Sequence, residues 1–297
     1  MLLARILLCL AILLPSSTMA GRAIFYQPQQ RDLELAESRW PVIFSEARAK
    51  GMDTLIVQWT AYGEVFASET KRVWLQSRLD EAIKAGMTVI VGLNADPDVF
   101  TRLEQPATVL GDYFRQQRRL DTNLAKYWLS VLPNNQIAGW YITLEVDDRR
   151  WRDTKALEVL KAHLQTEVSE LKAVGNKPVY ISSFFAGNMA PMNYADMLSQ
   201  LRQESKIQIL VQDGAGTAKL TNRERALYLN ALSDCKVPVS QGVVYEIFKQ
   251  TRHDQAFLAE PLTPQALAQV LQKRAPCGQD TVLFSLRYLI EFNQSVK

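Results

Sequence analysis

Residues 137–145 read Ile-Ala-Gly-Trp-Tyr-Ile-Thr-Leu-Glu, an apolar and β-rich run that ends in a carboxylate. Residues 239–246, Val-Ser-Gln-Gly-Val-Val-Tyr-Glu, end in the same way. A carboxylate at the end of an apolar strand costs free energy to desolvate unless it faces a cleft, a partner or water. Glu145 and Glu246 are therefore the first candidates for functional residues.

These two runs are the fourth and seventh of eight along the chain. The eight apolar or β-branched runs lie near residues 23–28, 54–60, 88–93, 137–145, 178–185, 207–213, 239–248 and 281–289. Stretches with helical periodicity separate them, near residues 38–49, 71–85, 115–130, 153–174, 191–204, 221–233 and 263–273. Strands that alternate with helices form parallel βαβ units. No Gly-x-Gly-x-x-Gly motif follows the first run, so we predict an α/β fold, a single-domain (β/α)8 TIM barrel, rather than an open dinucleotide-binding sheet.

The first twenty residues have the features of a secretory signal peptide. A basic residue precedes a short apolar stretch from Ile6 to Leu14, and small residues stand before a cleavage point near Ala20. A membrane anchor is the alternative, but a span needs about 20 apolar residues. We expect residues 21–297 to form a periplasmic or secreted barrel domain without a transmembrane span.

Composition excludes several classes of function. The chain has 297 residues and a formal net charge of +3, and its basic residues are scattered, so we expect no nucleic-acid partner. Only two histidines occur, His163 and His253, which rules out a three-histidine zinc site. The chain has neither a phosphate-binding loop nor a Gly-x-Ser-x-Gly elbow. We predict no metal and no cofactor, and His253, after the seventh run, is a possible substrate contact.

Two cysteines remain once the signal peptide is removed. Cys235 and Cys277 each stand shortly before a predicted strand, the seventh and the eighth. These strands are neighbours in a barrel, so a disulfide across the lower rim is the prediction for an oxidising compartment. Two unpaired thiols are the alternative.

Polar and aromatic residues gather at the ends of the predicted strands. In a TIM barrel the carboxyl ends of the strands line one shared bowl. Amides and carboxylates can bond sugar hydroxyls there, and aromatic rings can stack on the C–H faces of pyranoses. The candidate substrate-binding residues are Tyr26, Gln27, Gln58, Trp59, Tyr62, Asn94, Tyr141, Gln212, Asp213 and Tyr288. Trp140 and Tyr141 cannot both point inward, because successive strand residues face opposite sides, and Asp213-Gly is also a common turn signal.

Two carboxylates on either side of a glycosidic oxygen suffice for glycoside hydrolysis. One protonates the leaving oxygen, and the other attacks the anomeric carbon or activates water. Because the fourth and seventh strands face each other across a barrel, we expect a short separation and a retaining double displacement. Alternatively, Glu145 and Glu246 form ordinary buried ion pairs with Arg149, Arg252 or Arg287, or the protein is a glycan-binding barrel without catalysis.

Five strings resemble a bacterial family of exported TIM-barrel proteins that is catalogued as a domain of unknown function. They are Phe-Tyr-Gln-Pro at 25–28, Leu-Ile-Val-Gln-Trp-Thr-Ala-Tyr-Gly at 55–63, Gly-Trp-Tyr-Ile-Thr-Leu-Glu at 139–145, Gln-Asp-Gly-Ala-Gly at 212–216 and Tyr-Glu-Ile-Phe at 245–248. That family looks like a set of glycoside hydrolases. The resemblance implies a carbohydrate polymer as substrate and a link to envelope polysaccharide synthesis or export proteins.

More distantly, the two glutamates are similar to those of the large clan of retaining glycosidases. By that similarity Glu145 would be the acid/base and Glu246 the nucleophile. The clan usually has Asn directly before the first of these residues, where this chain has Leu144. The stretch 96–120 is long for a connection between a strand and a helix, and we expect it to form one wall of an extended cleft.

Overall fold

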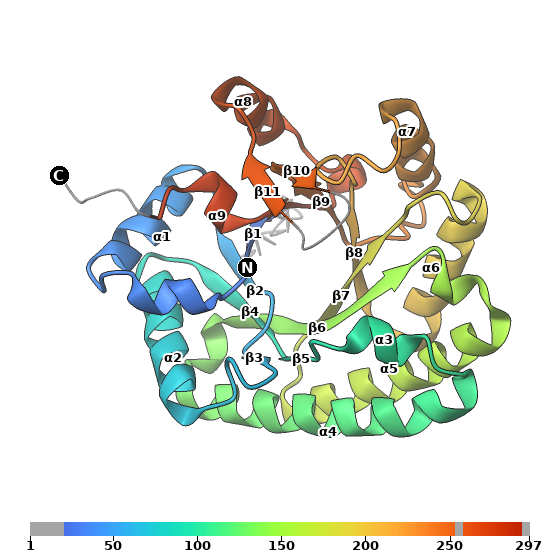
Figure 1. Cartoon of the computed structure of the whole chain (residues 1–297), viewed down its shortest axis with the longest axis horizontal. Helices are drawn as coiled ribbons and strands as arrows, with labels where there is room; N and C mark the ends of the chain where they lie inside the picture. The colour runs from blue at the N-terminus through green and yellow to red at the C-terminus, as the bar shows by residue number, and fades with distance from the viewer. Residues whose placement is uncertain (1–20, 253–257, 293–297) are drawn as a thin grey trace, which may run out of the picture.

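Eight parallel strands close into a barrel in the computed structural model, which describes residues 21–252 and 258–292. Around the barrel the strands are β1 (Arg22–Tyr26), β2 (Thr54–Val57), β4 (Thr88–Gly92), β6 (Ile137–Asp147), β7 (Val179–Phe184), β8 (Gln208–Gln212), β9 (Gly242–Glu246) and β12 (Asp280–Phe284). Figure 1 looks into this barrel, with the long helices outside it. The predicted TIM-barrel fold is confirmed.

The helices follow the strands in alternation. They are α1 (Arg39–Ala49), α2 (Glu69–Lys84), α3 (Val99–Leu103), α4 (Ala107–Val131), α5 (Thr154–Val174), α6 (Pro191–Ser205), α7 (Asn222–Ala231), α8 (Pro264–Gln272) and α9 (Leu286–Leu289). Four of them begin after a Ser, Thr or Asp whose side chain accepts a backbone N–H of the first turn: Ser68, Asp153, Thr221 and Thr263. These residues satisfy amide groups that a helix start leaves unpaired, so the sequence fixes these boundaries locally.

Three segments differ from the sequence prediction. Helix α4 begins at Ala107, so most of the stretch 96–120 is helical rather than an open connection. The eighth run divides after Phe284, and α9 follows because Leu286, Leu289 and Ile290 are buried at helical spacing. The end of the seventh run leaves the barrel as β10 (Phe248–Arg252), which pairs antiparallel with β11 (Leu258–Pro261). Short strands β3 (Ala61–Tyr62) and β5 (Asn94–Ala95) form a further pair.

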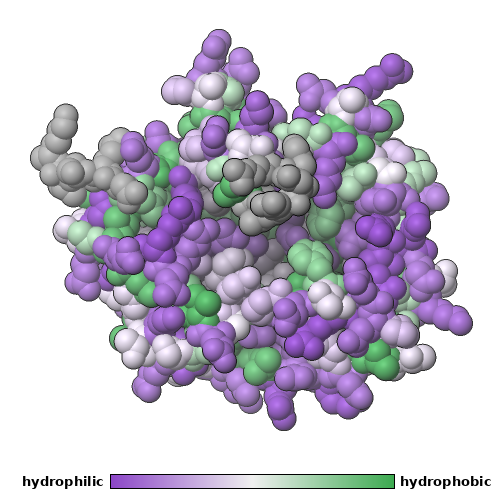
Figure 2. Space-filling view, in the orientation of Figure 1, coloured by the Kyte–Doolittle hydropathy of each residue, from purple (hydrophilic) through white to green (hydrophobic). Residues whose placement is uncertain are grey.

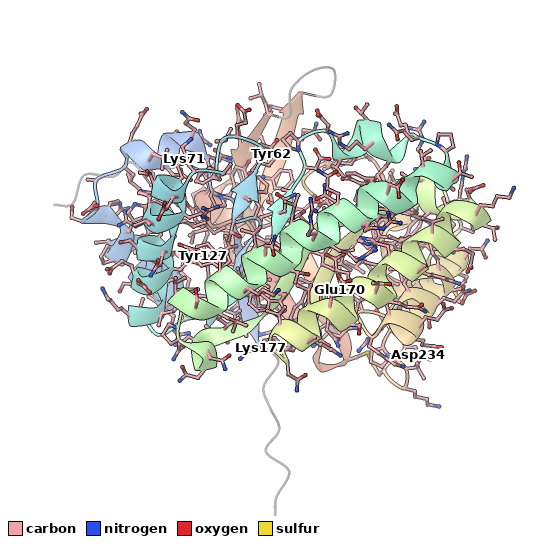
Figure 3. All side chains as sticks on the ribbon, turned by 90° about the horizontal axis from the view of Figure 1, so that it is seen from below. Tyr62, Lys71, Tyr127, Glu170, Lys177 and Asp234 are labelled. Carbon is pink, nitrogen blue, oxygen red and sulfur yellow. A yellow bond between two sulfur atoms is a disulfide. The ribbon has the colours of Figure 1, made fainter. Side chains whose placement is uncertain are left out.

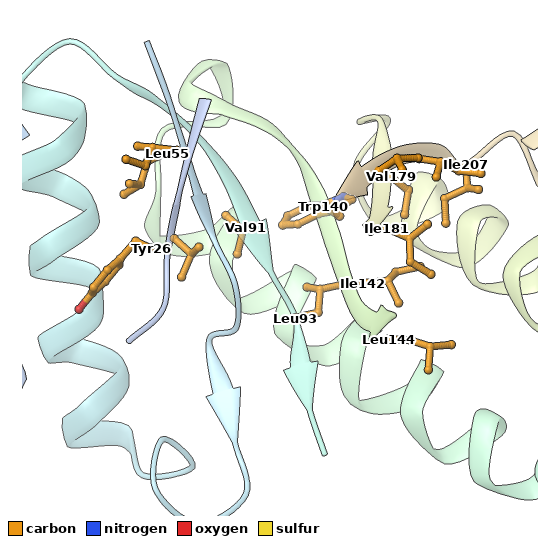
Figure 4. Packing of buried hydrophobic residues seen from close by; sticks show 14 of the residues in the cluster. Tyr26, Leu55, Val91, Leu93, Trp140, Ile142, Leu144, Val179, Ile181 and Ile207 are labelled. Carbon is orange, nitrogen blue, oxygen red and sulfur yellow. The ribbon is translucent and has the colours of Figure 1, made fainter. Parts of the chain in front are cut away.

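Alternation along the strands divides the apolar residues into two layers. Figure 4 shows residues of the outer layer, such as Trp140 and Ile142 on β6, which pack in one large cluster with the helices. The inner cluster fills the barrel with Ala23, Phe25, Ile56, Ile90, Tyr141, Leu210, Val244 and Val282. Every second residue of a strand points inward, so a residue two or four positions after a member of the inner cluster also points inward. These later residues lie at the mouth. They include Gln27, Gln58, Glu145, Gln212 and Glu246.

The other end of the barrel carries the disulfide. Cys235 and Cys277 are bonded, with their Cα atoms 5.0 Å apart, as predicted. Figure 3 shows Asp234, next to the first cysteine, at the end opposite to Tyr62 and the mouth. The predicted signal peptide, residues 1–20, lies outside the described residues. Within the described chain, every helix is too short or too polar to cross a membrane.

Candidate functional site

Glu145 and Glu246 line the same cavity at the barrel mouth. This central cavity has a volume of about 580 Å³, and Gln27, Gln58, Gln212 and Tyr288 from the predicted binding set also line it. Figure 2 looks onto this face, which is hollowed near its centre. Residues that the sequence did not single out complete the wall: Arg31, Phe184, Lys219, Phe248 and Phe284 among others. The two predicted catalytic carboxylates are therefore exposed to one shared space.

A bulge in β6 places Glu145. Its register with β7 shifts between Ile142 and Glu145, so that Glu145 lies opposite Ser182. Gln212 at the end of β8 donates a hydrogen bond from Nε2 to Glu145 Oε1 at 2.8 Å, and the Ser182 hydroxyl also bonds to the carboxylate. Burial raises the pKa of Glu145, against the opposing effect of the Gln212 hydrogen bond. This carboxyl group is thus oriented by side chains of two neighbouring strands and is biased toward its protonated form.

Tyr141 lies beneath Glu145 inside the barrel rather than on the cavity wall. Its side chain is only 1% exposed, and its hydroxyl is 2.5 Å from Ser182 Oγ. Burial, followed by the charge of Glu145, raises the pKa of the phenol, so Tyr141 is neutral. The structure thus places Tyr141 against Ser182 below the cavity, and not on the cavity wall where the sequence predicted a substrate contact.

Backbone amides fix Glu246 from the other side. Its Oε2 accepts hydrogen bonds from the N–H groups of Gly216 at 2.6 Å and Thr217 at 3.1 Å. Burial raises the pKa of Glu246 to about 7, helped by the charge of Asp213 and, to a smaller extent, that of Glu145. The effect of Glu145 on this pKa shows that the two carboxylates interact across the cavity. Near neutral pH the carboxyl group of Glu246 therefore exchanges a proton with solvent.

Asp213 supports this arrangement from behind. It is 2% exposed, and its Oδ1 accepts hydrogen bonds from the backbone N–H groups of Glu246 and Ala215, both at 3.1 Å. Arg225 Nη1 lies 3.8 Å from its other oxygen. Asp213 directly follows the inward-pointing Gln212, so its side chain points toward the outside of the barrel. It holds the turn that binds Glu246 and does not reach the cavity.

A smaller side cavity of about 160 Å³ adjoins the central one. Gln58 and Glu145 line both cavities, and the predicted residues Trp59, Tyr62 and Asn94 line the smaller one. The rings of Trp59 and Tyr62 stack with their centroids 4.8 Å apart. Together these residues make an aromatic wall beside the carboxylate of Glu145.

Sequence reasoning missed a pair of buried acids behind the side cavity. Asp121 on α4 and Glu167 on α5 both line it and are at most 3% exposed. Asp121 Oδ1 accepts a hydrogen bond from the Asn94 N–H at 2.7 Å, and His163 Nε2 lies 3.0 Å from Glu167 Oε2. Burial raises the pKa of both acids and lowers the pKa of His163 to about 3, so the histidine is neutral. Only the spacing of positions 163 and 167, one helical turn apart, hinted at this cluster.

The alternative of ordinary ion pairs is not what the described residues show. Arg287 pairs with Asp32 at 2.8 Å, and neither Glu145 nor Glu246 has a cationic group within 4.0 Å among the residues with described side chains. Tyr26 also donates its hydroxyl to Asp32, at 3.2 Å, and packs in the outer layer away from the cavity. The side chain of Arg252 and the whole of His253 lie outside the described part.

The predicted absence of a metal remains a prediction. Among the described residues no group of three His, Cys, Asp or Glu side chains is arranged to hold a metal ion. The polar residues that line the central cavity include amides and carboxylates, beside the basic residues Arg31 and Lys219. Amides and carboxylates are groups that bond sugar hydroxyls.

Comparison with solved structures supports the fold. A crystal structure from Bacteroides thetaiotaomicron, described as a "putative alpha-L-fucosidase", superposes with a TM-score of 0.66 at 15% identity, covering 90% of this chain and 87% of that one. The catalytic domain of a beta-amylase from Paenibacillus polymyxa gives a TM-score of 0.52 at 8% identity, covering 92% and 94%. At such low identity the likeness is one of fold alone.

Comparison of sequences shows the family. The uncharacterized protein YbcH of Escherichia coli (strain K12) is 40% identical over 285 residues, which is 96% of this chain and 95% of that protein. Residues 22–293, which include all eight barrel strands, match the domain of unknown function DUF4434. The chain therefore belongs to the DUF4434 family.

Proposed function

We propose that this protein is an exported glycoside hydrolase that cleaves glycosidic bonds of a cell-surface or exported bacterial polysaccharide. One observation carries the proposal: Glu145 and Glu246 come from β6 and β9 and line one cavity, and no cation neutralises either of them in the described part of the structure. The strands that supply them are separated by β7 and β8 in the barrel. We expect the space between the two carboxyl groups to hold a sugar linkage.

The roles follow from how each carboxylate is held. Glu246 keeps Oε2 on two backbone N–H groups, which leaves Oε1 as the attacking atom of a nucleophile. Glu145, biased toward protonation by burial, would donate its proton to the leaving glycosidic oxygen and later take one from water. Two interacting acids lose their protons in two steps, so there is a pH interval in which the pair holds one proton. The reactive form is the one in which Glu145 carries that proton and Glu246 is ionised, and retention is the expected stereochemistry.

The surroundings of the pair fit a carbohydrate. Gln27, Gln58 and Gln212 present amides to the central cavity, and the stacked rings of Trp59 and Tyr62 stand in the adjoining one. The structural neighbours include proteins named for action on glycosidic bonds. The disulfide fits an oxidising compartment, which agrees with a periplasmic or secreted protein and with partners in envelope polysaccharide synthesis or export.

The test is a screen of the purified protein against bacterial exopolysaccharides for released reducing ends. Glu145→Gln and Glu246→Gln should each lower turnover by about a thousandfold or more, because a carboxamide neither attacks nor donates a proton efficiently. Glu69→Gln, at an exposed position on α2, is the matched control and should keep full activity. NMR of the first product anomer then distinguishes retention from inversion.

Two results would contradict the proposal. If both Gln variants keep full activity on a glycan that the wild type cleaves, these carboxylates are not the catalytic ones. If the protein binds glycans of the panel tightly but releases no reducing ends from any of them, it is the glycan-binding barrel instead.

A further inference from the structure

The central cavity continues on both sides of the two carboxylates. On one side Phe100, Phe184 and Lys219 also line a depression of about 1040 Å³. On the other side Arg31 and Tyr288 also line one of about 1070 Å³. Because neighbouring depressions share wall residues, they form one groove across the mouth, with Glu145 and Glu246 in its middle section. Such a groove can hold a polymer chain on both sides of the bond to be cleaved.

Basic side chains without carboxylate partners line this groove. On the first side they are Arg149, Arg150, Arg152 and Lys219, which we call the basic arm. In the described residues, no member of the basic arm has a carboxylate within 4.0 Å. Arg150 donates to the Gln105 carbonyl at 2.9 Å, Arg152 donates to the Asn188 carbonyl at 3.3 Å, and Lys219 lies over the Phe184 ring. These heads keep most of their hydrogen-bonding capacity for a ligand.

Three of the four acids that line the same depression as the basic arm are bound to backbone amides, and the fourth, Glu104, is exposed. Asp147 Oδ1 accepts hydrogen bonds from the N–H groups of Arg149 and Arg150 at 2.7 and 2.5 Å. Asp148 is fully buried and accepts from the backbone of Ala186 and Asn188. Asp153 caps the first turn of α5. These carboxylates satisfy loop and helix amides, so they do not pair with the arginines beside them, whose guanidinium groups remain available to a ligand.

The opposite side of the groove repeats the pattern with one residue. Arg31 is exposed and, across the described part of the chain, has no carboxylate within 4.0 Å. Its neighbours in this depression do pair: Arg287 with Asp32, and Arg39 with Glu46 at 3.5 Å. Cations without a carboxylate partner therefore lie on both sides of Glu145 and Glu246: Arg31 in one outer section of the groove and the basic arm in the other.

We infer that the groove binds an acidic polysaccharide in mid-chain, with carboxylate groups of its sugar units on Arg31 and on the basic arm. Guanidinium groups bind carboxylates through paired hydrogen bonds, which gives geometric selection as well as attraction. The two glutamates repel acidic groups from the middle section, so the charged sugar units are those further from the scissile bond, in the outer sections of the groove. This inference rests on the proposed function only for the cleavage step, since binding can be measured without it.

The experiment measures binding in the Glu246→Gln background, so that no substrate is consumed. The probes are polygalacturonate, alginate, hyaluronan and gellan, each compared with its carboxyl-reduced form, which has the same chain without the charge. At low salt, at least one acidic polymer should bind about tenfold or more tightly than its reduced form, and the difference should shrink at high salt. If every acidic polymer binds no better than its reduced form, the inference is wrong.

Two sets of variants locate the contact. Arg149→Gln/Arg152→Gln on the basic arm and Arg31→Gln on the other side should each weaken binding of the acidic polymer severalfold, and leave the reduced form unaffected. Arg119→Gln/Arg223→Gln removes two exposed arginines outside the groove and should change nothing. If the control weakens binding as much as the arm variant does, or if only one side of the groove matters, the chain does not lie across the mouth as inferred.

The two proposals fail in different ways. Selective binding of an acidic polymer without release of reducing ends keeps this inference and contradicts hydrolysis. Cleavage of a neutral polymer with no preference for an acidic one keeps hydrolysis and contradicts this inference.

Discussion

Ionisation of the buried Glu246 should lower the free energy of unfolding in the pH range where the proposed mechanism requires an ionised nucleophile. Its pKa of about 7 exceeds the 4.5 of an unperturbed glutamate, mainly because the side chain is buried. The folded state therefore holds the proton more tightly than the unfolded state, and this contribution to stability is present below pH 4.5 and lost as the pH rises through 7. The difference of about 2.5 pKa units corresponds to at most about 3 kcal/mol.

Replacement of Glu246 by Gln tests this value. The amide oxygen of Gln can still accept the N–H groups of Gly216 and Thr217, while the buried charge is gone. We expect the free energy of unfolding of Glu246→Gln to exceed that of the wild type by about 1–3 kcal/mol at pH 8. At pH 4 the gain should be small, because the glutamate is protonated in the folded protein and mostly protonated in the unfolded chain.

Urea denaturation of both proteins at the two pH values measures the difference. The exposed Glu69→Gln variant controls for a general effect of removing a negative charge. A variant that is less stable than the wild type at pH 8 would refute the reasoning, and so would an equal gain at both pH values. Either result would mean that the cavity does not desolvate this carboxylate.

Three further predictions concern the scaffold and the wall of the site. The double variant Cys235→Ser/Cys277→Ser removes the disulfide between residues 42 apart in the sequence. Urea titrations should show a free energy of unfolding lower by up to about 4 kcal/mol, because the unfolded chain gains conformational entropy. An unchanged free energy of unfolding would mean that this gain is small. Gly216→Ala would place a Cβ 2.6 Å from the Phe248 ring and 2.7 Å from its carbonyl oxygen, so the turn must shift and release its hydrogen bond to the nucleophile. The acid limb of the pH–rate profile should then move to higher pH, and an unchanged profile would contradict the role of this amide. Trp59→Ala should raise KM about tenfold with a smaller change in kcat, whereas Trp59→Phe should keep most of the affinity; equal losses in both variants would argue against ring stacking.

Periodicity alone made the barrel predictable. The eight apolar runs and the helices between them are local patterns, and each needs only its own residues and their caps to be recognised. The same alternation also separates Gln212, which reaches the cavity, from Asp213, which does not. The same alternation excludes Tyr26 from the cavity lining, because the neighbouring Phe25 points into the barrel and Tyr26 must point outward.

The end of the chain shows where local patterns mislead. Residues 281–289 are apolar throughout, and a strand and a short helix are hard to separate in such a run. Packing of Leu286 and Leu289 against the outer layer decides it. Helix α4 begins earlier than the predicted residue 115, and Leu110 and Phe114 in its first turns are buried one helical turn apart.

The sequence by itself determined the existence of the eight barrel strands, the alternation that sends Glu145 and Glu246 to the mouth, and the pair of cysteines. Only the tertiary structure decided what those residues experience there. The turn that binds Glu246, the pairing of Asp121 with Glu167 and the open groove join segments that are far apart in the chain. Desolvation and charge coupling depend on which distant groups exclude water, and no local pattern of residues encodes that exclusion.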